Sequence, residues 1–420
     1  MHDRQPFAGI RVIEFGQFVA VPFCSQLLAQ GGAEVIKIES LEGDSVRQLG
    51  QLVEGETRIF LSRNRGKHSL PLALRSEGAA EVIDQLLSNA DVALMNFRPG
   101  LAEGFGLDGP TLRKKYPRLV IGTVTPFGPL GPDALKAGMD IVVQARSGLM
   151  VANGRQEDGR PVPGDPVSAD YMCAMTLAFG IAAALFRRES TGEGGEVHTS
   201  LLQAALTINN SQMLRVDSIE AEQHAADLRD LNDKRASGAS YEELRGGNLA
   251  GRANSMLNVY FRTYHTKDGW LAVACGSPSL RKRFAECVGL DDPHFGADIG
   301  GAAYYEQLGR TAETIFMAKT TSEWEAIFEG AGVPASSVKF PIELLDDPQI
   351  EANQMLTDFE HPRLGRIRAM APPLGLDDDG FRTVGATPQF ATETRAILGE
   401  LGIDPATIDR LMADGVTREA

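Results

Sequence analysis

Strand-like and helix-like segments alternate along the first 124 residues, and this alternation constrains the fold more than any other feature of the chain. Runs of β-branched and apolar residues predict strands at 10–15, 34–38, 92–95 and 119–124. Helices are predicted between them at 22–30, 78–88 and 101–115. Parallel strands need a crossover connection, which a helix supplies. The sequence therefore predicts a Rossmann-like, doubly wound parallel sheet.

The turn after the first strand argues against a nicotinamide cofactor. Residues 16–22 read Gly-Gln-Phe-Val-Ala-Val-Pro, with Gly16 as the only glycine. A dinucleotide-binding turn needs the pattern G-x-G-x-x-G, so that the backbone can approach the pyrophosphate closely. Glu39, at the end of the second strand, resembles the acid that binds a ribose. Without the glycines, the sequence does not favour such a site.

The chain changes character after residue 215. Residues 216–244 are charged, rich in alanine and predicted to be helical. A hairpin is predicted where strands at 259–264 and 270–275 flank a turn, and helices follow at 279–288, 303–317 and 321–329. Beyond residue 334 the composition again resembles the opening section, with a helix at 392–401. We therefore expect a large domain at 1–215 and 336–420, a linker at 216–245, and a smaller α+β domain at 246–335.

Composition limits the partners of the chain. Its 420 residues, 43% of them hydrophobic, suffice for two domains. The formal charge of −15 argues against a nucleic-acid surface. The four cysteines lack paired spacing, so neither a disulfide nor a metal site is expected. There is no signal-peptide pattern, and no uninterrupted apolar run reaches the roughly 18 residues of a membrane span. We therefore expect a cytoplasmic protein without a membrane partner.

A single carboxylate stands at the entrance to the most apolar segment of the chain. Asp170 ends the stretch Gly-Asp-Pro-Val-Ser-Ala-Asp, and residues 171–185 are almost wholly apolar. Burial disfavours an ionised carboxylate, whereas the N-terminus of a helix stabilises it. Asp170 is therefore either a helix cap, which is the commoner role of such a residue, or a carboxylate used in chemistry.

The whole chain resembles the class III CoA-transferases, which include formyl-CoA transferase and carnitine CoA-transferase and are related to the α-methylacyl-CoA racemases. The matching segments follow one another in the family's order: residues 9–15, 32–39, 43–47, 64–67, 96–100, 140–148, and Asp170 followed by 180–192. The resemblance implies a CoA-transferase built as an interlocked homodimer, in which each chain threads through the other.

In this family the Asp that opens the long helix is the nucleophile, and Asp170 matches that position. The resemblance implies that Asp170 attacks an acyl-CoA to form an aspartyl anhydride, which CoA converts into an aspartyl-CoA thioester that the acceptor acid then attacks. A carboxylate suits this role because its acyl adduct stays activated, unlike an ester of serine. With a reference pKa of about 3.9, Asp170 is expected to be ionised at neutral pH without an activating base.

Further site residues are implied by the same resemblance. Backbone N–H groups at the start of the helix after Asp170, and the loop of Gly246 and Gly247 that closes over the site in this family, would stabilise the oxyanions. Gln17 is a further catalytic candidate. CoA is expected as a thioester substrate, with no tightly bound cofactor, and the candidates for binding it are Asn96, Phe97, Arg98, Lys136, Arg75 and Lys67.

Departures from the family pattern bear on the alternatives. Racemases carry a His directly before the Asp of a Gly-His-Asp motif, but here Met139 precedes Asp140, and methionine cannot exchange a proton. Val21 replaces a glycine, and Ser40 and Gly104 replace arginines. A racemase or isomerase of the same fold and a non-catalytic CoA-binding protein remain the alternatives. The sequence identifies neither the acyl donor nor the acceptor acid.

Overall fold

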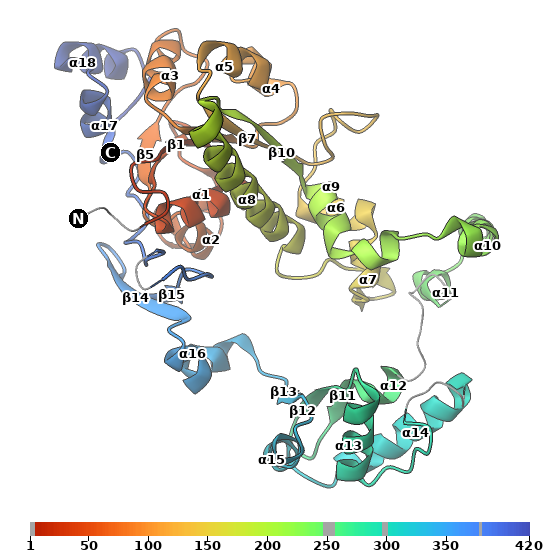
Figure 1. Ribbon diagram of the computed structural model, residues 1–420. Coiled ribbons are helices and arrows are strands. Elements are labelled where there is room, and N and C mark those ends of the chain that lie inside the picture. Colours follow the sequence, from red (N-terminus) through yellow and green to blue (C-terminus); the bar gives the residue numbers. More distant parts are fainter. Residues whose placement is uncertain (1–4, 247–256, 296–300, 378–379) are drawn as a thin grey trace. The chain divides into compact units, whose positions relative to one another are not determined.

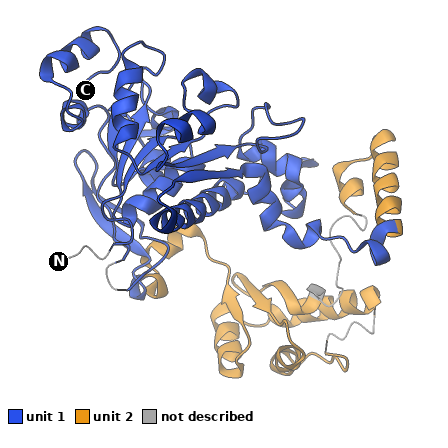
Figure 2. Ribbon diagram, turned by 45° about the horizontal axis from the view of Figure 1, so that its top comes forward, with its two compact units in different colours: residues 1–221, 351–420 blue, residues 222–350 orange. Residues whose placement is uncertain are grey.

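The computed structural model describes residues 5–246, 257–295, 301–377 and 380–420. The chain forms two compact units, which Figure 2 shows in different colours. Unit 1 contains residues 1–221 and 351–420, and unit 2 contains residues 222–350. Helix α10 (Asp217–Ala236) begins in unit 1 and continues in unit 2, where α11 (Tyr241–Arg245) follows it.

A six-stranded sheet forms the centre of unit 1 (Figure 1). Every pair of neighbouring strands is parallel, so the predicted parallel sheet is confirmed. The strands lie in the order β10 (Gly195–Ser200), β7 (Val120–Thr125), β6 (Val92–Met95), β1 (Arg11–Phe15), β2 (Glu34–Glu39) and β5 (His68–Pro71). From β1 the chain continues outward through β2 to β5, and from β6 it continues in the opposite direction through β7 to β10. A crevice at the carboxyl ends of β1 and β6 is where such sheets bind ligands.

Helices cover both faces of this sheet, because successive residues of a strand point to opposite faces. On one face Val12 and Val35 pack against α1 (Ala20–Gln30), α8 (Ser168–Thr191) and α9 (Leu201–Ile208). On the other face Ile13 and Ile36 pack against a second set of helices: α3 (Ala79–Ser88), α5 (Gly109–Lys115), α17 (Thr394–Glu400) and α18 (Pro405–Ala413). The C-terminal helices thus complete the core that the first residues begin.

One predicted helix is divided in the structure. The segment 101–115 forms α4 (Leu101–Gly104) and α5, separated by Gly106 with a φ of 66°. A positive φ suits glycine and ends the first helix, while Asp108 caps the second by accepting the backbone N–H of Thr111.

Unit 1 also contains shorter elements. They are β3 (Gln51–Val53), β4 (Glu56–Thr57), α2 (Arg58–Arg63), α6 (Asp140–Ser147), α7 (Leu149–Ala152), β8 (Gln156–Glu157), β9 (Arg160–Pro161), β14 (Leu356–His361), β15 (Gly365–Met370) and α16 (Pro348–Ala352), which starts in unit 2.

Unit 2 is a small α+β body. The predicted hairpin is present as antiparallel β11 (Phe261–His265) and β12 (Trp270–Ala274), and β13 (Ala335–Ser337) adds a third strand. Its core is aromatic, with the rings of Tyr264 and Phe316 stacked at 4.1 Å and with Trp324 against Phe316 at 4.8 Å. The helices are α12 (Leu257–Tyr260), α13 (Pro278–Val288), α14 (Gly301–Phe316) and α15 (Thr321–Ala331).

Candidate active site at the start of helix α8

Asp170 lies in the first turn of α8, and a carboxylate from another helix holds this turn in place. Asp140, the first residue of α6, is buried, and its Oδ1 accepts the backbone N–H groups of Ala169 (3.0 Å) and Asp170 (3.2 Å). Val167, at the N-cap position of α8, has no side chain that could cap the helix. Asp140 therefore caps α8 from a distance in sequence.

Gln144 fixes the segment that leads into Asp170. It lies one turn after Asp140 on the same face of α6, and its side chain is fully buried. Its Oε1 accepts the backbone N–H of Gly164 (2.9 Å), and its Nε2 donates to the Gly164 carbonyl (3.2 Å) and to Asp140 Oδ2. The backbone of the segment 164–170 is therefore held by the side chains of Gln144, at Gly164, and of Asp140, at residues 169 and 170.

The carboxyl group of Asp170 is poised between its two protonation states at neutral pH. Burial is the main cause that raises the pKa of Asp170 to about 7, and the negative charge of Asp140 adds to the rise, while the positive charge of Arg63 opposes it. The expectation of a fully ionised Asp170 at neutral pH is therefore wrong. A perturbed carboxyl group of this kind is typical of a functional site, because a structural cap is normally left ionised.

Arg63 and Tyr171 form a hydrogen-bonded pair near Asp170. Arg63 ends α2, and its Nε and one terminal nitrogen donate to the Tyr171 hydroxyl at 3.2 and 3.1 Å. The ring of Phe23 meets Tyr171 edge-on at 5.0 Å. Across the described part of the chain, no carboxylate lies within ion-pair distance of the Arg63 guanidinium. No local pattern predicts this pair, because 108 positions separate Arg63 from Tyr171.

Gln17 and Asn96 meet at the carboxyl ends of β1 and β6. Asn96 Oδ1 accepts the backbone N–H of Gln17 at 3.0 Å, and Asn96 Nδ2 donates to the Gln17 carbonyl at 2.8 Å. The Gln17 side chain accepts a hydrogen bond from Ser45 at 3.3 Å. Asn96 thus fixes the loop after β1 at the point where the strand order reverses, which is the usual ligand crevice of this fold.

A cavity of about 430 Å³, the crevice pocket, opens beside this loop. Phe97 lies in its wall with Phe15 and Phe105, at ring distances of 5.9 and 5.6 Å, and the Arg75 guanidinium lies 6.0 Å from the Phe105 ring. The predicted residues Gln17, Phe97 and Arg75 are brought together here. Aromatic walls with an exposed arginine suit a heteroaromatic ring that carries phosphates. The remaining lining residues are Ile38, Glu39, Ser40, Leu41, Glu42, Leu72, Ala73 and Leu74.

Lys67 is a correction to the sequence-based site. Its ammonium is buried and donates to Glu14 Oε2, the Pro22 carbonyl and Asn64 Oδ1, each at 2.8 Å. These three bonds use every donor of the ammonium, so none is left for a phosphate. Glu14 is also paired with Lys37, its register partner on β2, at 2.9 Å. Burial alone would raise the pKa of Glu14, but the two ammonium groups lower it to about 2.

The other predicted residues are not part of the crevice pocket. Arg98 is exposed just beyond β6, and Lys136 is exposed and paired with Asp133 at 2.6 Å. Gly246 belongs to unit 2, where it ends α11 by donating its N–H to the Glu242 carbonyl (2.8 Å). Gly247 lies outside the described residues.

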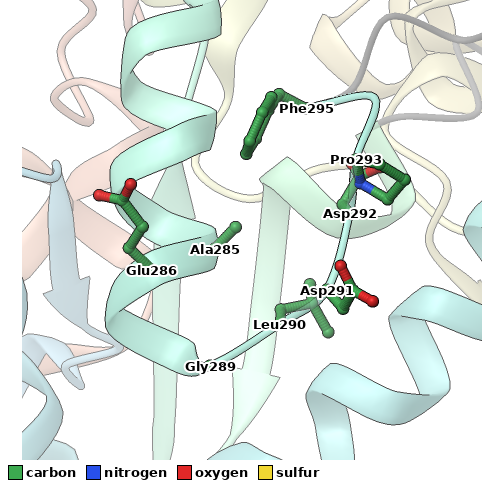
Figure 3. Close-up of a pocket in the computed structure, with 8 residues that line it drawn as sticks. All are labelled: Ala285, Glu286, Gly289, Leu290, Asp291, Asp292, Pro293 and Phe295. Atoms are coloured by element: carbon green, nitrogen blue, oxygen red, sulfur yellow. The ribbon is translucent and has the colours of Figure 1, made fainter.

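Unit 2 has a pocket of its own, shown in Figure 3, at the end of α13. Its lining contains the acids Glu286, Asp291 and Asp292 and no basic side chain. The Asp292 carboxylate accepts hydrogen bonds from the hydroxyls of Tyr260 (2.6 Å) and Tyr304 (2.9 Å). An acidic lining repels phosphates, so this pocket does not suit CoA. Among the described residues there is no cluster of His, Cys, Asp and Glu that could hold a metal ion, and all four cysteines are free.

Comparison with known proteins identifies one family. The family model described as CoA-transferase family III matches residues 7–394. The cinnamoyl-CoA:phenyllactate CoA-transferase of Clostridium sporogenes is 30% identical over 97% of this chain and 96% of the relative. The succinyl-CoA:glutarate CoA-transferase of Mus musculus is 26% identical over 99% of this chain and 91% of the relative. A solved CAIB/BAIF family protein from Brucella suis superposes with a TM-score of 0.73 at 27% identity, covering 94% of this chain and 99% of that one.

Proposed function

The chain belongs to CoA-transferase family III, and we propose that it transfers CoA from an acyl-CoA thioester to a free carboxylic acid through covalent intermediates on Asp170. Relatives named for cinnamoyl-CoA with phenyllactate and for succinyl-CoA with glutarate agree with an exchange between two acids. CoA enters and leaves as a substrate, and no tightly bound cofactor takes part. We propose that the reaction takes place in the cytoplasm.

In the proposed first half-reaction, a carboxylate oxygen of Asp170 attacks the thioester carbonyl. The carbon–sulfur bond breaks, CoA leaves as a thiolate, and a mixed aspartyl anhydride remains. The thiolate then attacks the aspartyl carbonyl and expels the donor acid as its carboxylate, which leaves an aspartyl-CoA thioester. The acceptor carboxylate then attacks the aspartyl-CoA thioester, which releases the CoA thiolate and forms a second mixed anhydride. The thiolate finally attacks the acyl carbonyl of this anhydride, which gives the new acyl-CoA and frees the Asp170 carboxylate. No electrons are transferred, and each intermediate keeps its activated acyl group.

The observation that carries this proposal is the environment of Asp170. Burial and the Asp140 charge oppose ionisation of a side chain whose backbone is fixed by Asp140 and Gln144. Such an arrangement is unfavourable for a residue that only caps a helix, since a cap benefits from its charge. It favours a nucleophile, because a carboxylate whose charge is disfavoured by its surroundings gains by forming a covalent bond.

The oxyanions of these steps need donors other than the first N–H groups of α8. The backbone N–H groups of Ala169 and Asp170 donate to Asp140, and that of Tyr171 donates to the Val167 carbonyl at 3.2 Å. The helix start was expected to supply such donors, but these contacts occupy the N–H groups of residues 169, 170 and 171. We propose, as the family resemblance implies, that the loop of Gly246 and Gly247 takes this role.

The crevice pocket is the proposed site of the CoA nucleotide. The Phe97 and Phe105 rings would contact the adenine, and Arg75 would pair with a phosphate. Exposed Arg98, beyond the same strand, and Lys136 are proposed as further contacts to the phosphates. The protein as a whole is acidic, so a phosphate group needs cations close to it.

The proposal includes a homodimer. On α8 the apolar side chains of Met175, Phe179 and Phe186 are exposed, and the Phe179 side chain keeps 77% of its surface accessible in the single chain. A row of exposed apolar side chains on one helix marks an interaction surface. By length and composition alone, α8 would also pass as a membrane-spanning helix. Its other face packs against α1 and the sheet strands β7 and β10, as a core helix does.

Acyl exchange is tested by incubating the protein with acyl-CoA donors and a panel of carboxylic acids, with detection of new acyl-CoA by mass spectrometry. We expect Asp170→Ala to abolish exchange while CoA binding persists. Hydroxylamine added during turnover should label the peptide that contains residue 170. Asp108→Ala is the matched control: it removes a helix cap at a cost of about 0.5–2 kcal/mol and should leave exchange unchanged.

Two rival functions predict different outcomes of these experiments. A non-catalytic CoA-binding protein would show no exchange and no labelled Asp170, and Asp170→Ala would then affect only stability. A racemase or isomerase would incorporate deuterium at the α-carbon of a chiral 2-methylacyl-CoA in D₂O without an added acid. Met139 stands where racemases place a histidine, so we expect no such incorporation.

A further inference from the structure

We propose that Arg63 binds a second anionic group of the carboxylic acid substrate, so that the acids exchanged by this enzyme are short dicarboxylates. This inference rests on the proposed function, because it assigns the substrate class of the site at Asp170. It is argued from the unused hydrogen-bond donors of Arg63, from its place beside the nucleophile, and from the way a guanidinium binds a carboxylate.

Among the described residues, the Arg63 guanidinium donates hydrogen bonds only to Tyr171, which leaves some of its donors unused. A guanidinium carries five N–H groups in a fixed plane, and the two hydrogen bonds to the Tyr171 hydroxyl use only two of them. Those two bonds, together with the position of the guanidinium 5.4 Å from the Tyr171 ring, orient the group. The described residues supply no carboxylate partner for it, although the side chain is half-buried. An arginine held in this way is prepared for an anion that arrives with the substrate.

The place of Arg63 relative to Asp170 matters as much as its free donors. The guanidinium is close enough for its charge to act on Asp170, yet the two groups form no ion pair within 4.0 Å. Arg63 is oriented by Tyr171, the residue next to Asp170 in the chain. A substrate bound to Arg63 would therefore have one end on the guanidinium and its other end beside the nucleophile.

The geometry of arginine explains why the bound group is a second carboxylate rather than the reacting one. A guanidinium binds a carboxylate through two parallel hydrogen bonds, which use both oxygens. A carboxylate bound in this way shares one lone pair of each oxygen with the guanidinium, and the positive charge makes it a weaker nucleophile toward the aspartyl-CoA thioester. The reacting carboxylate attacks best without such a partner, so we assign Arg63 to another anion on the same molecule.

Pairs of acids that differ only in the second carboxylate test this inference. Succinate is compared with butyrate, and glutarate with pentanoate, with one acyl-CoA donor held constant. We expect the wild-type enzyme to favour the dicarboxylate by at least about 100-fold in kcat/KM, because a monocarboxylate would leave the desolvated guanidinium unpaired. In Arg63→Met most of this preference should disappear through a higher KM for the dicarboxylate. Loss of the Arg63 charge also disfavours ionisation of Asp170 and slows exchange of both acids, so the quantity compared is the ratio of the two kcat/KM values.

Control variants separate recognition from structure. Arg63→Lys keeps a positive charge but not the paired N–H groups, so it should retain only part of the preference. Arg58→Met, an exposed arginine on the same helix, should leave both acids unaffected. If Arg63→Met is poorly folded by thermal melting, Arg63→Lys and Tyr171→Phe provide the comparison, since Tyr171→Phe removes the hydroxyl that orients the guanidinium.

The outcomes also distinguish this inference from the proposed function. If no acid accepts CoA and residue 170 is never labelled, the proposed function itself is wrong. If exchange and labelling occur but wild-type enzyme uses monocarboxylates equally well, or if Arg63→Met impairs both classes of acid to the same extent, then exchange stands and the assignment of Arg63 is overturned.

Discussion

The Oδ1 atom of Asp140 accepts the backbone N–H of Asp170 at 3.2 Å, so one carboxylate positions the backbone of another. The contact has two opposite effects. Its hydrogen bonds to residues 169 and 170 stabilise the first turn of α8, whereas its negative charge disfavours ionisation of the Asp170 side chain. Asp140 thus holds the proposed nucleophile in place and adds to the rise in its pKa that burial causes.

The rate of exchange should depend on the protonation of Asp170. Because the pKa of Asp170 is raised to about 7, kcat/KM should rise with pH through neutrality and level off above it. In Asp140→Asn the negative neighbour is gone, so the acidic limb of the profile should move to lower pH. Measuring kcat/KM from pH 5 to 9 for both proteins checks this. An acidic limb that stays in the same place in the variant would contradict the role given to Asp140.

The same pKa predicts how stability depends on pH. A carboxyl group whose pKa is higher in the folded state binds more protons there, so stability is lost as pH rises between the unfolded value near 4 and about 7. Asp170→Asn removes the ionisable group and should raise the melting temperature by several degrees at pH 8. The gain should shrink toward pH 4, where the carboxyl group is protonated in both states. Thermal melting across this range decides the point, and a gain that is constant with pH would refute it.

Lys67 and Arg75 should respond in opposite ways to loss of their charge. Lys67→Met breaks a buried ion pair with Glu14 and should destabilise the protein by about 3–5 kcal/mol in chemical denaturation. Arg75→Gln should leave stability nearly unchanged but weaken CoA binding roughly tenfold or more, as expected for a lost charge-assisted hydrogen bond. Calorimetric titration with CoA provides the second measurement. A stable Lys67→Met protein with weak CoA binding would reinstate Lys67 as a ligand contact.

Gly16 and Val21 should be coupled across the loop after β1. A Cβ atom added at Gly16 would lie 2.2 Å from Val21 Cγ1, so Gly16→Ala forces this loop or α1 to move. We expect a loss of about 1–3 kcal/mol, as for other overpacked sites. Val21→Gly removes the obstructing side chain, so the double variant should be more stable than the sum of the single changes predicts. A double-mutant cycle measures the coupling, and purely additive effects would show that the two residues do not meet.

Much of the site could be anticipated from local patterns. Asp170 at the start of an apolar helix, and Asn96 with Phe97 at the end of a buried strand, are sequence features that the fold puts to use. Asp140 and Gln144 carried a weaker signal: they stand one helical turn apart within a segment that matches the family. Lys67 was misjudged because it was chosen from its place in the family pattern, while its buried partner Glu14 lies 53 positions away.

The sequence by itself determined the parallel sheet and its two covering layers, because strands buried on both faces must be apolar almost throughout and helices must alternate with them. Only the tertiary structure decided the chemistry of the proposed nucleophile. The protonation of Asp170 depends on its burial, on the Asp140 carboxylate and on the Arg63 guanidinium. Electrostatic interactions depend on distance in space, and the fold, rather than proximity along the chain, brings these groups together.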